Sequence, residues 1–323
     1  MSGEPRLKKV LVTGGCGFIG SHLTERLGRA GFSTVVLDDL SSGLEQNVGE
    51  GAKFVRGSVT DREAVTSVLA GVDAVFHLAA RVSVRASLEE FRRDAEVNVM
   101  GTVNVLDCAR RAGVGRFIYA SSAAVYGQGE PGRASSEDSP TRPATPYGIS
   151  KLAGEMYVRT ICALSDLEYQ VLRFFNVYGP GQRMSPYSGV ITVFTGEALA
   201  GRAPTVFGDG EQVRDFIHVG DVVAAALLAL ESAKHGLTVN IATGRPCSVN
   251  ELSRMITGAV GLEAEPVHSE AVPGETRYSL GDTRLATDEL GFEAEGVLER
   301  MIADVIEWIR GRAGEAGTGC RRA

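Results

Sequence analysis

Short apolar runs alternate with amphipathic stretches through the first half of the chain. Within Ala95–Ala112, for example, Val99, Val103, Leu106 and Ala109 recur near helical spacing. Six runs have the unbroken apolar character of strands that are buried on both faces, and we predict strands over Lys9–Val12, Thr34–Leu37, Lys53–Val55, Ala74–Leu78, Phe117–Ser121 and Gln170–Phe174. This β-α order predicts an α/β fold, a doubly wound parallel sheet with a ligand crevice at the carboxyl ends of its strands.

The pattern changes after Asn176, where Gly- and Pro-rich loops separate shorter elements. A helix over Val222–Leu230 and a strand over Leu237–Ile241 are expected to return to the first lobe. The sequence therefore predicts three parts: a large lobe of residues 1–176 joined by returning segments near 215–243, a smaller C-terminal α/β lobe of residues 177–214 and 244–312, and a flexible tail of residues 313–323.

A glycine-rich turn follows the first predicted strand. Gly15-x-Gly17-x-x-Gly20, together with Gly14, fits the dinucleotide fingerprint. The first glycines allow a tight turn and a close backbone approach to a pyrophosphate, and the last allows the next helix to pack on the strand with its N-terminal amides facing the anion. Because the pattern lies between a strand and a helix, it predicts a nucleotide cofactor.

An acidic residue, Asp38, follows the second apolar run eighteen positions after Gly20. A carboxylate there can accept hydrogen bonds from both hydroxyls of a ribose and would repel a 2′-phosphate, which favours NAD over NADP. The alternative is that Asp38 and Asp39 only end a strand in solvent or cap a helix. The fingerprint expects an acid after about twenty residues, so the spacing favours the coenzyme role.

A phenol and an ammonium lie four residues apart in Tyr147-Gly-Ile-Ser-Lys151, on one face of a helix expected to begin near Pro146. An adjacent cation lowers the phenol pKa of about 10 by roughly 1–3 units, toward that of a base near neutrality. Lysine is rare here, with five among 33 basic residues. A compact ammonium bridges a ribose and a phenolate better than a planar guanidinium does. The alternative is an exposed helix pair without chemistry.

The strand before that helix ends in two hydroxyls, Ser121 and Ser122. The carboxyl ends of parallel strands present ligands, so Ser122 can bond a substrate alcohol and relay its proton to Tyr147. The alternative is that the serines only cap the strand end, which is the expectation for Ser121. Ser122, Tyr147 and Lys151 are therefore the candidate catalytic residues.

The composition of the chain bears on which ligands it binds and in which compartment it works. The 323-residue chain has a formal net charge of −7 and only short basic clusters such as Arg92-Arg93, so nothing marks a surface for nucleic acid or membrane. No apolar signal region opens the sequence, and no run approaches the length of a membrane span. Five cysteines without paired metal spacing suit a reduced protein better than a disulfide framework. We expect a cytoplasmic protein without a metal.

Five segments resemble the motifs of one protein family: Thr13–Gly20, His77–Ala80, Ser121–Gly127, Tyr147–Lys151 and Arg173–Pro180. Together they resemble the extended short-chain dehydrogenase/reductase family, and within it the UDP-glucose 4-epimerase branch. The resemblance implies a Rossmann-type fold, NAD as cofactor, a UDP-sugar as substrate and a homodimer built through a helical bundle in the first half. It implies NAD contacts at Gly14, Gly17, Phe18, Ile19, Gly20, Asp38, Ser58, Val59, Leu78, Ala79, Ala80, Asn98, Tyr147 and Lys151.

The same resemblance implies where a nucleotide sugar binds. Asn176 matches the family position at the sugar diphosphate, and Arg214 would meet a phosphate bidentately. The full set of implied substrate contacts is Ser83, Ser122, Tyr147, Asn176, Val190, Val206, Arg214, Arg277 and Ser279.

Three positions leave alternatives open. Many relatives carry arginine where this chain has Val272, so Arg277 is either a second phosphate ligand or a surface charge. Ser58 stands where relatives usually place an aspartate near the adenine. Ser279 is either a small gate residue that leaves room for an N-acetyl group on the sugar or an ordinary exposed serine.

One local feature discriminates between reactions. Dehydratases of the family usually carry Asp-Glu directly after the catalytic hydroxyl and decarboxylases usually keep the glutamate, whereas this chain has Ala123-Ala124. No side chain there can move a proton, which favours an epimerase that oxidises C4 of a UDP-hexose and returns the hydride. A net oxidoreductase, a dehydratase, a decarboxylase and a non-catalytic NAD-binding regulator stay open, because fold does not decide chemistry.

Overall fold

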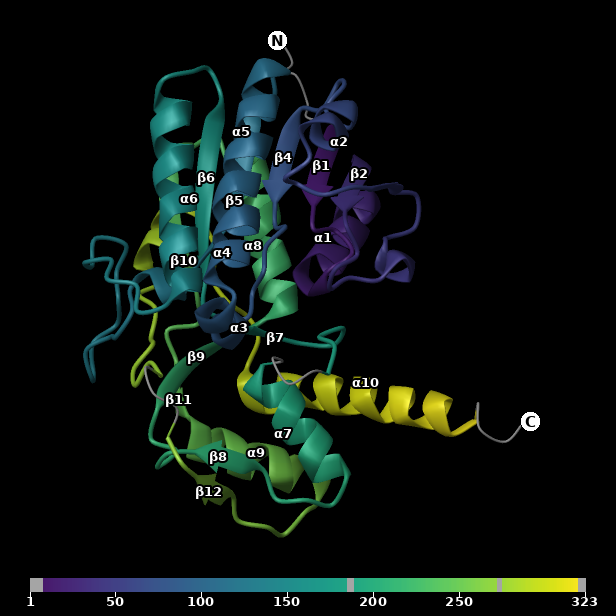
Figure 1. The fold of residues 1–323 in the computed structure, drawn as a ribbon. Coiled ribbons are helices and arrows are strands. Elements are labelled where there is room, and N and C mark those ends of the chain that lie inside the picture. Colours follow the sequence, from purple (N-terminus) through teal and green to yellow (C-terminus); the bar gives the residue numbers. More distant parts are fainter. Residues whose placement is uncertain (1–7, 185–188, 272–274, 319–323) are drawn as a thin grey trace.

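Apolar runs that are buried on both faces pair into one seven-stranded sheet in which every neighbouring pair is parallel (Figure 1). The computed structural model describes residues 8–184, 189–271 and 275–318. The strand order is β10-β6-β5-β4-β1-β2-β3. The strands are β1 (Lys9–Thr13), β2 (Ser33–Asp38), β3 (Lys53–Arg56), β4 (Ala74–His77), β5 (Arg116–Ser122), β6 (Glu168–Phe174) and β10 (Leu237–Ile241). All six predicted strands and the α/β fold class are confirmed.

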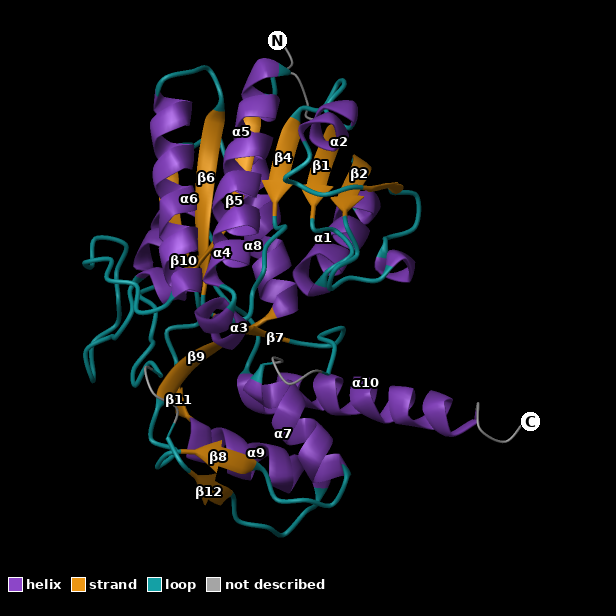
Figure 2. Cartoon of the chain, in the orientation of Figure 1, coloured by secondary structure: helices purple, strands orange, loops and turns teal. Residues whose placement is uncertain are grey.

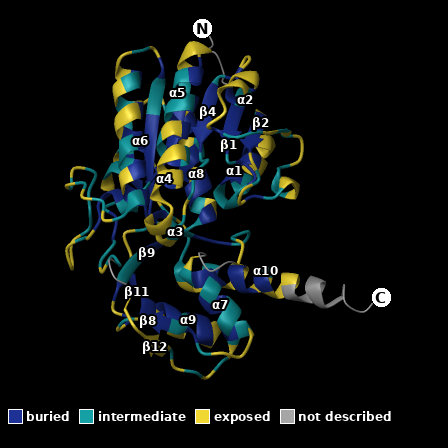
Figure 3. Cartoon of the chain, viewed as in Figure 1, coloured by how far each residue is buried: buried dark blue, intermediate teal, exposed yellow. Residues whose placement is uncertain are grey.

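Helices cover both faces of this sheet (Figure 2). Because successive side chains of a strand point to opposite faces, Val12 packs in one core cluster and Leu11 in the other. Figure 3 shows the sheet as a buried layer between partly exposed helices. One face carries α1 (Phe18–Arg29) and α8 (Val219–Glu231), and the other carries α2 (Arg62–Ser67), α5 (Thr102–Arg111) and α6 (Pro146–Ala163).

A smaller lobe lies at the carboxyl edge of the sheet (Figure 1). It has its own apolar core, which includes Phe194, Leu252 and Val305. Its elements are β7 (Asn176–Tyr178), α7 (Val190–Leu199), β8 (Thr205–Phe207), β9 (Val213–His218), β11 (Pro246–Ser248), α9 (Val249–Val260), β12 (Val267–Ser269) and α10 (Leu298–Thr318). The chain returns to the large lobe through α8 and through β10, which pairs with β6. Among the described residues, no helix is both long and apolar enough to cross a bilayer.

Short elements connect these parts. They are η1 (Glu45–Asn47), α3 (Val84–Glu89), α4 (Phe91–Ala95), η2 (Glu96–Gly101), η3 (Ala123–Val125) and η4 (Ala286–Leu290). The helix expected over Ala95–Ala112 is therefore not one α-helix, because the π-helical turn η2 separates α4 from α5. The Thr102 hydroxyl donates to the carbonyl of Asn98, and a Cβ at Gly101 would crowd Val59. This local widening turns the Asn98 side chain into the protein.

Residues 313–318 of the expected tail belong to a helix. Helix α10 continues to Thr318, and residues 319–323 lie outside the described residues. Val305, Ile306 and Ile309 anchor the helix in the core of the small lobe.

A buried ion pair joins helix α6 to the sheet. Glu155 is 0% and Arg173 3% exposed, and the guanidinium of Arg173 donates to both carboxylate oxygens at 2.9 and 2.7 Å. The Ser121 hydroxyl also donates to Glu155. Arg173 donates further to the hydroxyl of Tyr126, which in turn donates to Asn240 on β10. These bonds satisfy two charges that would otherwise be costly to bury.

We expect the variant Glu155→Gln to lose about 3–5 kcal/mol of unfolding free energy, because it leaves the Arg173 guanidinium buried without a countercharge. The measurement is urea unfolding followed by circular dichroism. The matched control is Glu25→Gln, which breaks a pair with Arg29 in which both side chains are more than half exposed and should change stability little. Equal losses in the two variants would contradict the argument.

Candidate active site

The glycine turn after β1 has no space for side chains at two positions. Gly14 has a φ of +74°, and a Cβ there would lie 2.7 Å from the backbone nitrogen of Ala79. A Cβ at Gly20 would collide with the carbonyl oxygen of Gly14. Helix α1 begins after Gly17, with no side chain capping its first amides. The turn therefore offers backbone N–H groups at close range, as a pyrophosphate requires.

Asp38, the last residue of β2, is tied to that turn. One carboxylate oxygen accepts a hydrogen bond from the backbone N–H of Cys16 at 3.0 Å, and the other accepts one from Leu40 at 2.8 Å. Burial raises the pKa of this carboxyl, and the two backbone hydrogen bonds oppose that rise. Each oxygen keeps a lone pair that can accept a hydroxyl proton. The residues present therefore fit the ribose and pyrophosphate of a dinucleotide.

The other expected coenzyme contacts lie along the same edge of the sheet. Leu78 and Ala79 follow β4 and hydrogen-bond to the backbone and hydroxyl of Thr13, and Ala80 comes next in the same loop. Val59 and Ser58 follow β3, and the Ser58 hydroxyl is shared with Thr60.

Asn98 differs from these residues, because its side chain is 1% exposed and is bonded within the protein. Its amide accepts from the backbone N–H of Arg81 at 2.8 Å and donates to the Arg81 carbonyl at 2.9 Å. The structure therefore places Asn98 as a support for the loop after β4.

The three candidate catalytic residues come together where β5 ends and α6 begins. Thr145 caps α6 by accepting from the Gly148 N–H, which puts Tyr147 in the first turn. Lys151, one turn later, donates to the Ala120 carbonyl at 2.9 Å, with its Nζ 5.9 Å from the centre of the Tyr147 ring. Ser122 lies within hydrogen-bonding reach of the Tyr147 hydroxyl and lowers the pKa of that phenol.

The expectation that Lys151 brings the Tyr147 pKa toward neutrality is wrong in direction. Burial raises the pKa of Tyr147 to about 12, the hydrogen bond with Ser122 opposes this, and the Asp94 carboxylate adds to it. Burial also lowers the pKa of Lys151 to about 8, while Asp94 and Glu155 oppose that fall. The loss of water around the phenolate and around the ammonium has a larger effect on the two pKa values than the attraction between these groups has.

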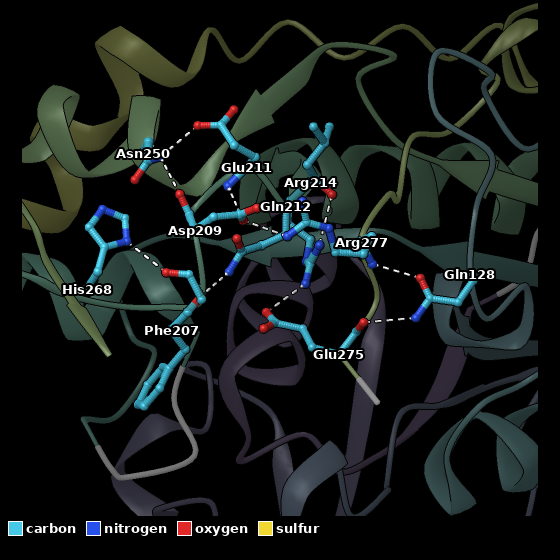
Figure 4. A network of polar contacts seen from close by, with 12 residues as sticks. Gln128, Phe207, Asp209, Glu211, Gln212, Arg214, Asn250, His268, Glu275 and Arg277 are labelled. Atoms are coloured by element: carbon cyan, nitrogen blue, oxygen red, sulfur yellow. Dashed lines mark hydrogen bonds and ion pairs between the residues drawn. The ribbon is translucent and has the colours of Figure 1, made fainter. Parts of the chain in front are cut away.

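The two arginines expected at the diphosphate lie in one polar network of the small lobe (Figure 4). Arg214, on β9, is 3.0 Å from a carboxylate oxygen of Glu275. Arg277 makes a bidentate pair with Asp209 at 2.6 and 3.0 Å. Gln128, from the large lobe, donates to the Glu275 carbonyl and accepts from the Arg277 N–H. Each of the two guanidinium groups is therefore paired with a carboxylate. Gln128 links the segment that contains Glu275 and Arg277 to the large lobe.

The remaining expected substrate contacts divide into two groups. Asn176 pairs with Phe216 in neighbouring strands, and the Ser279 N–H donates to the carbonyl of Val213, so both lie beside β9. The others serve local structure, with Ser83 capping α3 and with Val190 and Val206 packing in the core of the small lobe. Val272 and the Pro273-Gly274 pair lie outside the described residues.

Four buried polar residues around Tyr147 and Lys151 were not predicted from the sequence. The Ser87 hydroxyl accepts from the Tyr147 N–H, and the Ser150 hydroxyl donates to the Tyr147 carbonyl. Asp94 and Glu155 supply the carboxylates. Asp94 lies four residues before Asn98, and Glu155 lies four residues after Lys151. These spacings became informative only once the buried faces of the helices were known.

Comparison with known proteins agrees with this geometry. Residues 10–242 match the sequence profile described as the NAD dependent epimerase/dehydratase family. A UDP-glucose 4-epimerase from Mycolicibacterium smegmatis is 39% identical over 313 residues, which cover 94% of this chain and 99% of that protein.

Solved structures are similar over the same extent. The structure of UDP-glucose 4-epimerase from Thermotoga maritima with UDP-glucose matches with a TM-score of 0.92 and 38% identity. The Thermus thermophilus UDP-glucose 4-epimerase complex with NAD matches with a TM-score of 0.88 and 34% identity. Each match covers 94% of this chain and 99% of the other. The chain therefore belongs to the NAD dependent epimerase/dehydratase family.

Proposed function

We propose that this protein is an NAD-dependent epimerase that inverts C4 of a UDP-hexose, interconverting UDP-glucose and UDP-galactose. The observation that carries the proposal is the meeting of Ser122, Tyr147 and Lys151 at the carboxyl edge of the sheet. This cluster lies between a glycine turn suited to a dinucleotide and a lobe that presents arginines suited to a diphosphate. Relatives named UDP-glucose 4-epimerase, similar over nearly their whole length, support it.

The glycine turn and Asp38 would hold NAD, with Leu78–Ala80 and Ser58 along the same edge. When bound, NAD supplies the acceptor and later the donor of a hydride, and a positive charge that favours a phenolate nearby. Tyr147 removes the proton of the sugar 4-hydroxyl, directly or through Ser122, and later returns a proton to the 4-keto oxygen. Lys151 stays fixed by its bond to the Ala120 carbonyl.

The small lobe would hold the diphosphate while the 4-keto sugar turns its other face. Arg214 is mostly buried and exchanges its partner Glu275 for phosphate oxygens, and Asn176 binds beside it. Inversion needs no further proton transfer to carbon. The 3₁₀ turn η3 directly after Ser122 begins with Ala123-Ala124, which cannot supply the acid and base of a dehydratase.

The sugar that the site accepts is part of the proposal. Ser279 lies beside β9, where its backbone N–H donates to the carbonyl of Val213, the residue before Arg214, and a small side chain at this position would leave space for an N-acetyl group on C2. We therefore propose that N-acetylated UDP-hexoses are accepted as well as plain ones.

The test is to incubate the purified protein with UDP-glucose, UDP-galactose and UDP-N-acetylglucosamine and to follow C4 stereochemistry by proton NMR. Interconversion without net NADH supports the proposal, and stoichiometric NADH would favour an oxidoreductase instead. Tyr147→Phe should lower turnover by about 10²–10⁴-fold, because it removes the base, while UDP binding by calorimetry stays unchanged. Substantial epimerisation by Tyr147→Phe would overturn the assignment of the base.

We expect Gly20→Ala to lose bound NAD, because its Cβ collides with the Gly14 carbonyl and distorts the pyrophosphate turn. The measurement is the NAD content of the purified protein, with NAD affinity by fluorescence titration. The matched control is Gly28→Ala in the same helix, where the nearest atom to a new Cβ is 3.6 Å away. The control should keep NAD and gain roughly 0.5–1 kcal/mol of stability. Equal NAD content in both variants would show that the turn tolerates a side chain.

We propose that the protein acts as a homodimer in the cytosol. Apolar side chains are exposed on one face formed by α3 to α6, where Phe91 and Leu164 are 63% and 79% exposed. Met100, Met156 and Tyr157 continue this face, and a groove between α5 and α6 runs beside Tyr157 and Leu164. An exposed apolar face of this extent favours packing of α5 and α6 against the same helices of a second copy. The four described cysteines are buried and unpaired, which suits a reducing compartment.

We expect sedimentation equilibrium to give the mass of two chains, and Met156→Lys with Leu164→Lys to give the mass of one, because the charges would be buried at the interface. The control is Val267→Lys on β12, an exposed apolar residue of the small lobe. A single-chain mass for the unaltered protein would refute the dimer.

A further inference from the structure

A buried carboxylate acts on both Tyr147 and Lys151, and among the described residues it forms no ion pair. Asp94, in α4, is 1% exposed. Its Oδ2 accepts a hydrogen bond from the Asn98 amide at 2.7 Å, and among the described residues its Oδ1 has no hydrogen-bond partner. Buried carboxylates are usually bonded at both oxygens, so an unpaired one calls for a reason.

The surroundings of Asp94 tie it to the first turns of α6. The Asn98 amide that holds Asp94 also donates to the Ser150 hydroxyl at 3.2 Å, and Ser150 donates to the Tyr147 carbonyl at 2.9 Å. Helix α4 packs directly on α6. The Asp94 charge acts on both ends of the pair, because it raises the pKa of Lys151 and that of Tyr147.

We propose that Asp94 is a positioning residue: its buried charge keeps the Lys151 side chain an ammonium, fixed on the Ala120 carbonyl, and thereby sets the pH range in which Tyr147 acts as the base. This inference rests on the proposed epimerase function. It concerns a residue on a different helix from Tyr147 and Lys151.

Few other charges face Asp94. On α6 this is Lys151, which is also close to Glu155, a carboxylate paired with Arg173. The loop after β4 brings Arg81, whose guanidinium pairs with Glu90 at 2.6 Å.

The remaining titratable neighbours are neutral near pH 7. Burial raises the pKa of the Tyr119 phenol on β5 far above its ordinary value, and burial lowers the pKa of His77 on β4 to about 3. Of the two carboxylates that raise the pKa of Lys151, Asp94 is the one without an arginine partner among the described residues. Burial raises the pKa of Asp94 itself, and Ser150, Lys151 and Arg81 oppose that rise.

The variant Asp94→Asn isolates this charge. The side chain keeps its shape, its oxygen can still accept from the Asn98 amide, and the new NH₂ replaces the oxygen that has no hydrogen-bond partner. Removing the negative charge lowers the pKa of Tyr147 and that of Lys151. The two ionisations that bound the pH profile of turnover should therefore both move to lower pH.

The experiment measures kcat for UDP-galactose against pH with the NAD-loaded protein. We expect both limbs of the Asp94→Asn profile to move down by about one pH unit. Glu25→Gln, which removes an exposed carboxylate from α1, should leave the profile in place. A uniform loss of kcat with unmoved limbs would mean that Asp94 serves only the packing of α4, and would overturn the proposal.

A second readout does not require turnover. Ultraviolet titration of the NAD-loaded protein, with Tyr147→Phe in each background as the blank, reports the ionisation of Tyr147. We expect a lower midpoint in Asp94→Asn, and an unchanged midpoint would overturn the proposal. This titration tests Asp94 even if the unaltered protein fails to epimerise any UDP-sugar, so the two failures are distinguishable. If Asp94→Asn does not fold, Asp94→Glu keeps the charge and should keep the pH range at reduced kcat; a shifted range would count against the proposal.

Discussion

The ammonium of Lys151 is buried, and the arrangement of the site follows from keeping it charged there. A buried ammonium is costly unless acceptors and negative charge surround it. The Ala120 carbonyl accepts its hydrogen bond, and Asp94 and Glu155 provide the opposing charge. These contacts fix the rotation of α6 against β5. Because Tyr147 is one turn earlier on the same helix, that rotation also holds the phenol at the end of β5, within reach of Ser122.

A second buried carboxylate organises the junction of the lobes. Asp215, on β9, is fully buried and accepts hydrogen bonds from the backbone and hydroxyl of Thr243 and from the N–H groups of Gly244 and Gly281. It thereby ties β9 to the loop that follows β10 and to the segment after Ser279. Arg214 is the residue before Asp215, so the same bonds hold the backbone that carries its guanidinium. The position of Arg214 is therefore set by backbone that both lobes share.

Burial works against a phenolate at Tyr147 near neutral pH. In the protein alone, loss of water raises the Tyr147 pKa to about 12 and lowers the Lys151 pKa to about 8. A positive nicotinamide nearby favours the phenolate and opposes the effect of burial. The polar network of Glu155, Arg173, Tyr126 and Asn240 keeps the surrounding helix and strands in register.

Hydrophobic period and local motif spacing act within short stretches of chain, so the sequence alone predicted the parallel sheet and the glycine turn and singled out Asp38, Ser122, Tyr147 and Lys151 as candidates. It did not reveal the π turn before Thr102, the pairing of Arg277 with Asp209, or the direction of the Tyr147 pKa shift. Each of these depends on residues distant in sequence, or on how far water is excluded from a helix face. Only the tertiary structure fixes those distances and that burial, and it alone brought Asp94 to the pair that the motifs had identified.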